Sequence, residues 1–116
     1  EVRFRLPHSN SLIGLDVAYI SADTAGKLAR NAVAIDDLPV LAVEIVSPSD
    51  THERLVGRVE MLLEVGVPVI WVIDPDFQTV QIHRSGQRPV TLNTTQTLTG
   101  DAELPGFSVP VQELFE

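Results

Sequence analysis

The 116-residue chain has the length of one domain, and its lack of cysteine excludes disulfides, thiolate metal sites and cysteine nucleophiles. Its net charge of −8 argues against non-specific binding of nucleic acid, because such binding depends on Lys and Arg contacts to phosphate. The absence of cysteine fits a reducing cytoplasm, so we expect a cytoplasmic protein, and no apolar run approaches the ~20 residues that span a bilayer, so we expect no membrane partner. The chain starts directly as a strand without an initiator methionine, so we expect a single domain over residues 1–116, truncated at its N-terminus.

The first part of the chain predicts two strands and a short helix. Apolar and charged residues alternate over residues 1–6, and residues 15–20 form a second apolar segment typical of a strand. A polar loop at residues 7–11 separates them. Ser21 begins a cap-like sequence that predicts a helix near residues 22–30.

The middle of the chain predicts a parallel strand–helix–strand unit. Residues 40–47 are apolar on both faces, as in a central strand covered on both sides. Ser49 or Asp50 is expected to cap the next helix, whose core-facing stripe consists of Leu55, Val59, Leu62 and Leu63. Gly66 suits the position that ends this helix, and residues 67–73 follow as a second buried strand. A crossover of this length implies that the two strands are parallel.

The last part of the chain predicts shorter elements. Residues 79–83 alternate as in an exposed antiparallel strand, and residues 89–92 follow a turn as another. Residues 98–104 predict irregular or weakly stranded structure, and residues 111–115 predict a short helix. The whole pattern indicates an α/β fold with a mixed sheet and few helices.

Glu44 is the residue that most needs an explanation, because it lies in the middle of an apolar strand. An unpaired charge in a sheet core costs several kcal/mol, so such a carboxylate usually has a partner, takes up a proton or binds a metal. The simplest interpretation is an ordinary ion pair with one arginine, or a place at an exposed sheet edge.

Asp16 and Arg58 are the two candidates that could act with Glu44. Asp16 opens an apolar strand, and two carboxylates on separate strands could converge on a hard cation such as Mg²⁺. Arg58 falls on the apolar stripe of the predicted helix, so its guanidinium could reach Glu44 or a phosphate. The alternative for each is structural: Asp is common at strand ends, and an arginine stem can lie on the core edge with its head in water.

Several other kinds of site are unsupported. The sequence contains no H-E-x-x-H, G-x-S-x-G, P-loop or G-x-G-x-x-G motif. Ser47 and Ser49 have no evident base beside them, and Trp71 is expected in the core.

The order of the motifs resembles a known family. The strand at residues 15–20 is followed by Val43-Glu44-Ile45-Val46-Ser47-Pro48-Ser49, Glu64-Val65-Gly66-Val67, Trp71-Val72-Ile73-Asp74-Pro75, Leu104-Pro105-Gly106-Phe107 and Glu113-Leu114-Phe115. Over residues 13–116 this series resembles the Uma-type restriction-endonuclease family, a branch of the PD-(D/E)xK nuclease superfamily.

The resemblance implies a restriction-endonuclease-like fold, a mixed sheet flanked by few helices, here without the N-terminal helical segment of the family. It implies an endonuclease that hydrolyses DNA phosphodiester bonds with Mg²⁺ or Mn²⁺. The implied metal ligands are Asp16, Glu44 and the backbone carbonyl of Ile45. Arg58 stands where the family carries a lysine on the helix, and it would hold the phosphate. Double-strand cleavage in this superfamily further implies a homodimer.

Departures from the family pattern keep a second function open. Val46 stands at the superfamily's usual lysine position, Leu15 replaces a proline, and Leu62 replaces a tyrosine. Arg58 stays charged and cannot act as a base. The alternatives are a catalytically degenerate nuclease-fold module with a binding or regulatory role, and a structural piece with ordinary ion pairs. Carboxylates within about 6 Å of each other would favour a metal site. A bidentate pair between Arg58 and Glu44 would favour the inactive module.

Overall fold

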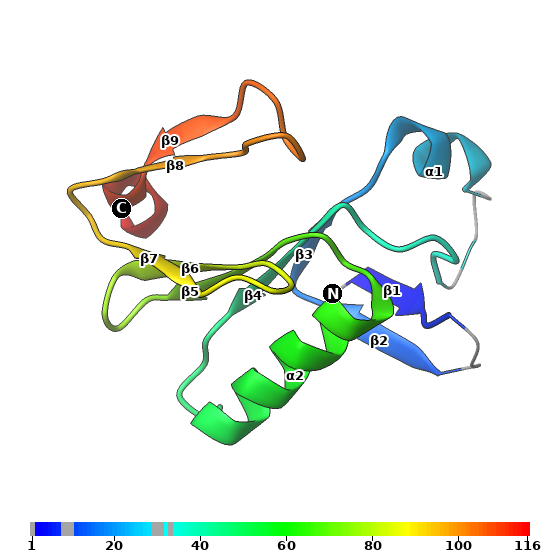
Figure 1. The fold of residues 1–116 in the computed structure, drawn as a ribbon, viewed down its shortest axis with the longest axis horizontal. Helices are drawn as coiled ribbons and strands as arrows, with labels where there is room; N and C mark the ends of the chain where they lie inside the picture. Colours follow the sequence, from blue (N-terminus) through cyan, green and yellow to red (C-terminus); the bar gives the residue numbers. More distant parts are fainter. Residues whose placement is uncertain (1, 8–10, 29–31, 33) are drawn as a thin grey trace.

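The fold is organised around a five-stranded mixed sheet. The computed structural model describes residues 2–7, 11–28, 32 and 34–116. In spatial order the sheet contains β3 (Val17–Tyr19), β4 (Leu41–Ile45), β5 (Ile70–Asp74), β6 (Thr79–His83) and β7 (Val90–Leu92). Strands β4 and β5 are parallel and are joined through α2 (His52–Val65), and the other neighbours are antiparallel. The predicted α/β fold with a mixed sheet and few helices is confirmed (Figure 1).

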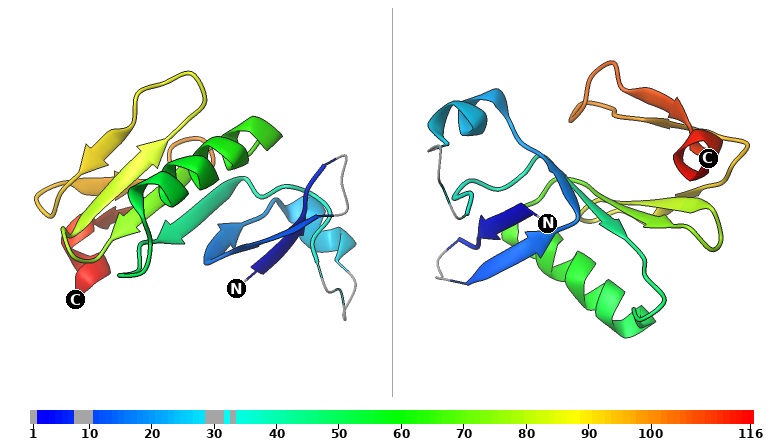
Figure 2. Two further views of the ribbon diagram at one scale, coloured as in Figure 1. Left: turned by 90° about the horizontal axis from the view of Figure 1, so that it is seen from below. Right: turned by 180° about the vertical axis from the view of Figure 1, so that it is seen from behind.

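One face of the sheet is covered by α2 and by a separate hairpin. The hairpin consists of β1 (Val2–Arg5) and β2 (Leu12–Leu15), and its Phe4 is fully buried. Ala42 and Val72 of the sheet share one apolar cluster with Phe4 and with Leu62 of α2. Figure 2 shows α2 lying across the sheet on this side.

The opposite face is covered by the C-terminal elements. Strands β8 (Thr97–Thr99) and β9 (Ser108–Pro110) form an antiparallel hairpin, and η1 (Val111–Phe115) follows it as a 3₁₀ helix. Leu98 and Val111 are buried against Val43 and Trp71. The ring of Trp71 also contacts that of Phe107, with centroids 5.6 Å apart. Residues 41–44 of β4 are therefore buried on both faces, as its continuous apolar run predicts, whereas Ile45 at its end is exposed.

Both ends of α2 are fixed by local chemistry. Thr51, rather than Ser49 or Asp50, is the N-cap, and its hydroxyl accepts a hydrogen bond from the Arg54 amide at 3.2 Å. Asp50 is unavailable as a cap because its carboxylate accepts hydrogen bonds from Ser47. Gly66 ends the helix with φ of 112°, a left-handed conformation that favours glycine, as predicted.

Three predicted elements differ in the structure. The strand expected at residues 15–20 is divided by a bend at Asp16, so that β2 ends before it and β3 begins after it. Helix α1 (Ala22–Lys27) is shorter than expected, and two of the remaining predicted positions, 29 and 30, lie outside the described residues. Of residues 98–104, predicted as irregular or weakly stranded, the first two belong to β8, and β9 lies beyond this segment, where no strand was predicted. No helix in the described part of the chain is long and apolar enough to span a membrane.

Candidate functional site

Glu44 lies in the core on the α2 side of the sheet. Alternate residues of a strand point to opposite faces, so Glu44 shares its face with Ala42, which packs in the α2-side cluster. Only 6% of Glu44 is exposed, and among the described residues it is the buried residue that carries a charge. Strand β4 therefore holds this carboxylate in one place, since apolar neighbours leave it little room to move.

Asp16 lies near Glu44 at the end of the β3–β4 pair. The register ends at Val17 and Val43, and Asp16 and Glu44 are the residues next to that last pair. The charge of Asp16 acts on the Glu44 carboxylate. The Asp16 Oδ2 atom accepts a hydrogen bond from the Ile45 amide at 2.8 Å, which holds the bend against the end of β4.

Arg58 joins the two sides of the site from α2. Its Nε donates to Glu44 Oε1 at 2.5 Å, and its Nη2 donates to the backbone carbonyl of Gly14 on β2. The contact with Glu44 uses one nitrogen, so it is not the bidentate pair that would favour an inactive module. The Arg58 side chain is 30% exposed, so the guanidinium borders both the buried acid and solvent.

The charge state of Glu44 follows from these neighbours. Burial raises the pKa of Glu44 above 4.5, because a charged carboxylate loses hydration in the core. The Arg58 guanidinium opposes this rise, whereas the negative charge of Asp16 adds to it. A second cation near both carboxylates would relieve the repulsion between Asp16 and Glu44.

The turn after β4 fixes the position of α2 relative to Glu44. Asp50 Oδ2 accepts hydrogen bonds from the Ser47 amide at 2.8 Å and from the Ser47 hydroxyl at 3.1 Å. The Ser47 amide is the main reason that the pKa of Asp50 lies below its usual range, and the positive charges of Arg54 and Arg58 add to the effect. Asp50 therefore stays ionised and holds the turn in shape.

The donor atoms at this site fit a hard divalent cation. Carboxylate and carbonyl oxygens are the ligands that Mg²⁺ prefers, and one or two carboxylates are typical of a Mg²⁺ site. Asp16 and Glu44 supply the carboxylates, and the Ile45 backbone lies beside Asp16. No group of three or more His, Cys, Asp or Glu side chains within reach of one ion occurs in the described part of the chain. A metal here would depend on two carboxylates, backbone oxygen and water.

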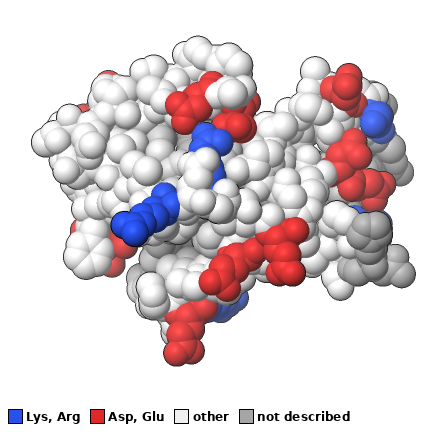
Figure 3. Space-filling model, in the orientation of Figure 1, with Lys and Arg blue, Asp and Glu red and all other residues white. Residues whose placement is uncertain are grey.

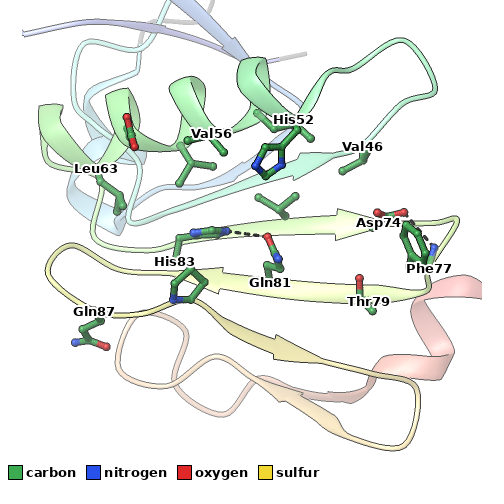
Figure 4. Close-up of a pocket in the computed structure, with 15 residues that line it drawn as sticks. Val46, His52, Val56, Leu63, Asp74, Phe77, Thr79, Gln81, His83 and Gln87 are labelled. Atoms are coloured by element: carbon green, nitrogen blue, oxygen red, sulfur yellow. Dashed lines mark hydrogen bonds between the residues drawn. The ribbon is translucent and has the colours of Figure 1, made fainter.

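A separate groove lies on the other side of α2, over β5 and β6 (Figure 4). It has a volume of about 780 Å³, and its walls are mostly apolar. His52 and His83 enter it from α2 and β6, and His83 bonds Gln81 at 3.2 Å between the ring nitrogen and the amide oxygen. Burial lowers the pKa of His83. The sequence gives no sign of this groove beyond the alternation over residues 79–83, which places Gln81 and His83 on one face.

Charge is unevenly distributed around α2. Its exposed acids are Glu53, Glu60 and Glu64, and Figure 3 shows acidic side chains following the helix on one face of the molecule. Arg54 and Arg58 lie four residues apart on a different side of the helix, the side that meets Glu44. The basic side of α2 therefore borders the candidate site.

Comparisons with known proteins indicate a nuclease-like fold. The profile of a family named Uma2, described as "Putative restriction endonuclease", matches residues 1–112. A crystal structure from Anabaena variabilis, described as that of "a putative nuclease belonging to DUF820", matches with a TM-score of 0.83 and 20% sequence identity. The match covers 99% of this chain and 65% of that one, so this chain spans 65% of the length of that protein. No curated protein matches the chain.

Proposed function

Because the chain belongs to the Uma2 family, we propose that it is an endonuclease that hydrolyses phosphodiester bonds in DNA with Mg²⁺ or Mn²⁺. The observation that carries this proposal is that Asp16 bonds the Ile45 amide directly after buried Glu44, with Arg58 in contact with Glu44. Two carboxylates and an arginine at one point match the needs of metal-assisted phosphate hydrolysis.

Each residue has a distinct role in the proposed reaction. Asp16, Glu44 and the backbone carbonyl of Ile45 would hold the ion. A bound divalent ion supplies an activated water and neutralises charge on the phosphate. Arg58 would stabilise negative charge on the scissile phosphate in the transition state. Arg58 stays protonated near neutral pH, so it does not serve as the general base.

We further propose that the active form is a cytoplasmic homodimer. One site made of Asp16, Glu44 and Arg58 cuts one strand, so a double-strand cut calls for two sites. The argument for a dimer is this ratio of one site to one cut strand. Analytical ultracentrifugation of the protein with and without a DNA duplex would measure the number of subunits.

A plasmid-cleavage assay tests the proposed function. We expect the wild-type protein to nick or linearise supercoiled plasmid with Mg²⁺ or Mn²⁺ and to lose this activity in EDTA. Glu44→Gln and Asp16→Asn should each abolish cleavage, because each removes a charged metal ligand. Asp74→Asn is the matched control, since Asp74 is a carboxylate of β5 whose oxygen caps a turn by accepting from the Asp76 and Phe77 amides. Cleavage that persists unchanged in Glu44→Gln would reject the assignment.

A catalytically degenerate module is the second function that a specific observation favours. Arg58 already forms an ion pair with Glu44 and a hydrogen bond with the Gly14 carbonyl. Val46 is uncharged, so it cannot bind a phosphate through an ion pair. The same assay separates the two functions. A degenerate module would bind a DNA duplex without cutting it at any Mg²⁺ or Mn²⁺ concentration, whereas the proposed enzyme would cut it.

A further inference from the structure

The charged side chains of α2 separate into two stripes. At 100° per residue, exposed Glu53, Glu60 and Glu64 fall within one narrow stripe, and Arg54 and Arg58 fall on a neighbouring one. The arginine stripe borders Glu44, whereas the groove over β5 and β6 lies on the other side of the helix. A polyanion that approaches the Glu44 site would therefore meet the basic side of α2 before the acidic one.

Most cations in the described part of the chain are already neutralised by a nearby acid. Arg58 pairs with Glu44, and further ion pairs join Arg5 to Asp36, Lys27 to Asp37, and Arg84 to Asp101 and Glu103. Within that part, the structure gives the guanidinium groups of Arg54 and Arg88 neither an ion pair nor a hydrogen bond, and both residues are exposed. Arg54 is the one of the two that lies on α2, about one turn before Arg58, which contacts Glu44.

The surroundings of Arg54 explain why it stays unpaired. Its positive charge acts on Asp50 together with that of Arg58, so both arginines lie near the turn that follows β4. Asp50 nevertheless directs its Oδ2 atom to the Ser47 amide and hydroxyl, and no ion pair with Arg54 forms. The Arg54 amide donates a hydrogen bond to the Thr51 hydroxyl, which fixes the start of the helix backbone. The Arg54 residue itself is exposed to solvent.

We propose that Arg54 contacts the DNA backbone next to the phosphate held by Arg58. This inference rests on the proposed function. Four residues along a helix correspond to about one turn of 5.4 Å, so two long arginine side chains on this stripe reach neighbouring phosphates of one strand. An unpaired arginine can form a bidentate contact with phosphate without first breaking an ion pair.

The salt dependence of DNA binding tests this proposal. Binding of a labelled duplex is measured by anisotropy without divalent metal, so that no cleavage occurs. Each phosphate contact contributes about 0.9 to the slope of log affinity against log salt, so Arg54→Ala should lower the slope by about 0.9. Between about 50 and 200 mM salt, the variant should then lose about 3.5-fold less affinity than the wild type. Arg54→Lys should keep the wild-type slope.

Arg88→Ala is the matched control, because Arg88 is also exposed and unpaired but lies on the turn between β6 and β7. Its slope should equal that of the wild type. Two results would overturn the role of Arg54 and leave the nuclease proposal intact. One is a salt slope for Arg54→Ala equal to that of the wild type. The other is the same decrease of the salt slope in Arg54→Ala and in Arg88→Ala. A wild-type protein that binds no duplex at any salt overturns both.

Discussion

Replacing Arg58 by methionine tests how the buried charge of Glu44 is tolerated. The change keeps much of the apolar stem but removes the cation that contacts Glu44 at 2.5 Å. Breaking a fully buried ion pair costs about 3–5 kcal/mol, whereas exposed pairs contribute about 0–1 kcal/mol. The Glu44 side chain is 7% exposed and that of Arg58 is 30% exposed. We therefore expect Arg58→Met to lower the free energy of unfolding at pH 7 by about 2 kcal/mol.

The pH dependence of this loss identifies its cause. The pKa of Glu44 is raised above 4.5 in the folded protein, so folding favours the protonated acid. Glu44 then contributes stability below about pH 4.5 that is lost as the pH rises through its folded pKa. Removing Arg58 raises the folded pKa further, so the destabilisation is greatest near pH 7. It should fall below about 1 kcal/mol once Glu44 is protonated, because only a neutral hydrogen bond and packing remain.

Urea denaturation of both proteins at pH 7 and near pH 4.5 measures the effect. Arg54→Met is the control, because Arg54 is exposed on the same helix, and it should change stability by less than about 0.5 kcal/mol. A double-mutant cycle with Glu44→Gln should show that the cost of Arg58→Met shrinks when Glu44 carries no charge. An equal loss at both pH values, or a loss no larger than that of Arg54→Met, would refute the reasoning.

Four further substitutions give predictions at individual positions. Gly100→Ala should lower the free energy of unfolding by about 1–3 kcal/mol, because its Cβ would collide with the backbone of Leu104. Gly57→Ala, whose added methyl group meets open space on α2, should raise the free energy of unfolding by about 1 kcal/mol. Thermal melts in which Gly100→Ala is more stable than Gly57→Ala would contradict both predictions. Thr51→Ala should cost about 1 kcal/mol through loss of the N-cap, and urea titration showing no change would contradict the cap assignment. Asp16→Asn should lower the pKa of Glu44, since the charge of Asp16 raises it; an unchanged carboxyl titration by NMR would show that the two acids do not interact.

The central strand–helix–strand unit could be predicted because each signal was local. Apolar runs place β4 and β5 in the core, and the stripe of α2 with Gly66 at its end defines the helix. The same stripe placed Arg58 at the core edge, from which it reaches Glu44. Periodicity allowed this contact as one of several interpretations of Arg58, and the ion pair in the structure selects it.

Other features depended on contacts between distant segments and were missed. The bend at Asp16 is held by the Ile45 amide, 29 residues away, and an alternating sequence gives no sign of it. Ser49, Asp50 and Thr51 are all residue types that cap helices, so the sequence does not distinguish them. Thr51 is the N-cap of α2 because the Asp50 carboxylate accepts a hydrogen bond from Ser47 instead. Strand β8 was predicted only as irregular or weakly stranded structure and β9 was not predicted, because strands of three residues are too short to show a period.

The most direct test of the proposed site is a calorimetric titration of Mn²⁺ into the protein, because it needs no knowledge of a DNA target. We predict one binding event in the wild type that is lost in both Glu44→Gln and Asp16→Asn, since both carboxylates hold the same ion. Asp74→Asn should bind Mn²⁺ as the wild type does. Equal Mn²⁺ binding in the wild type, Glu44→Gln and Asp16→Asn would contradict the site at the end of β4.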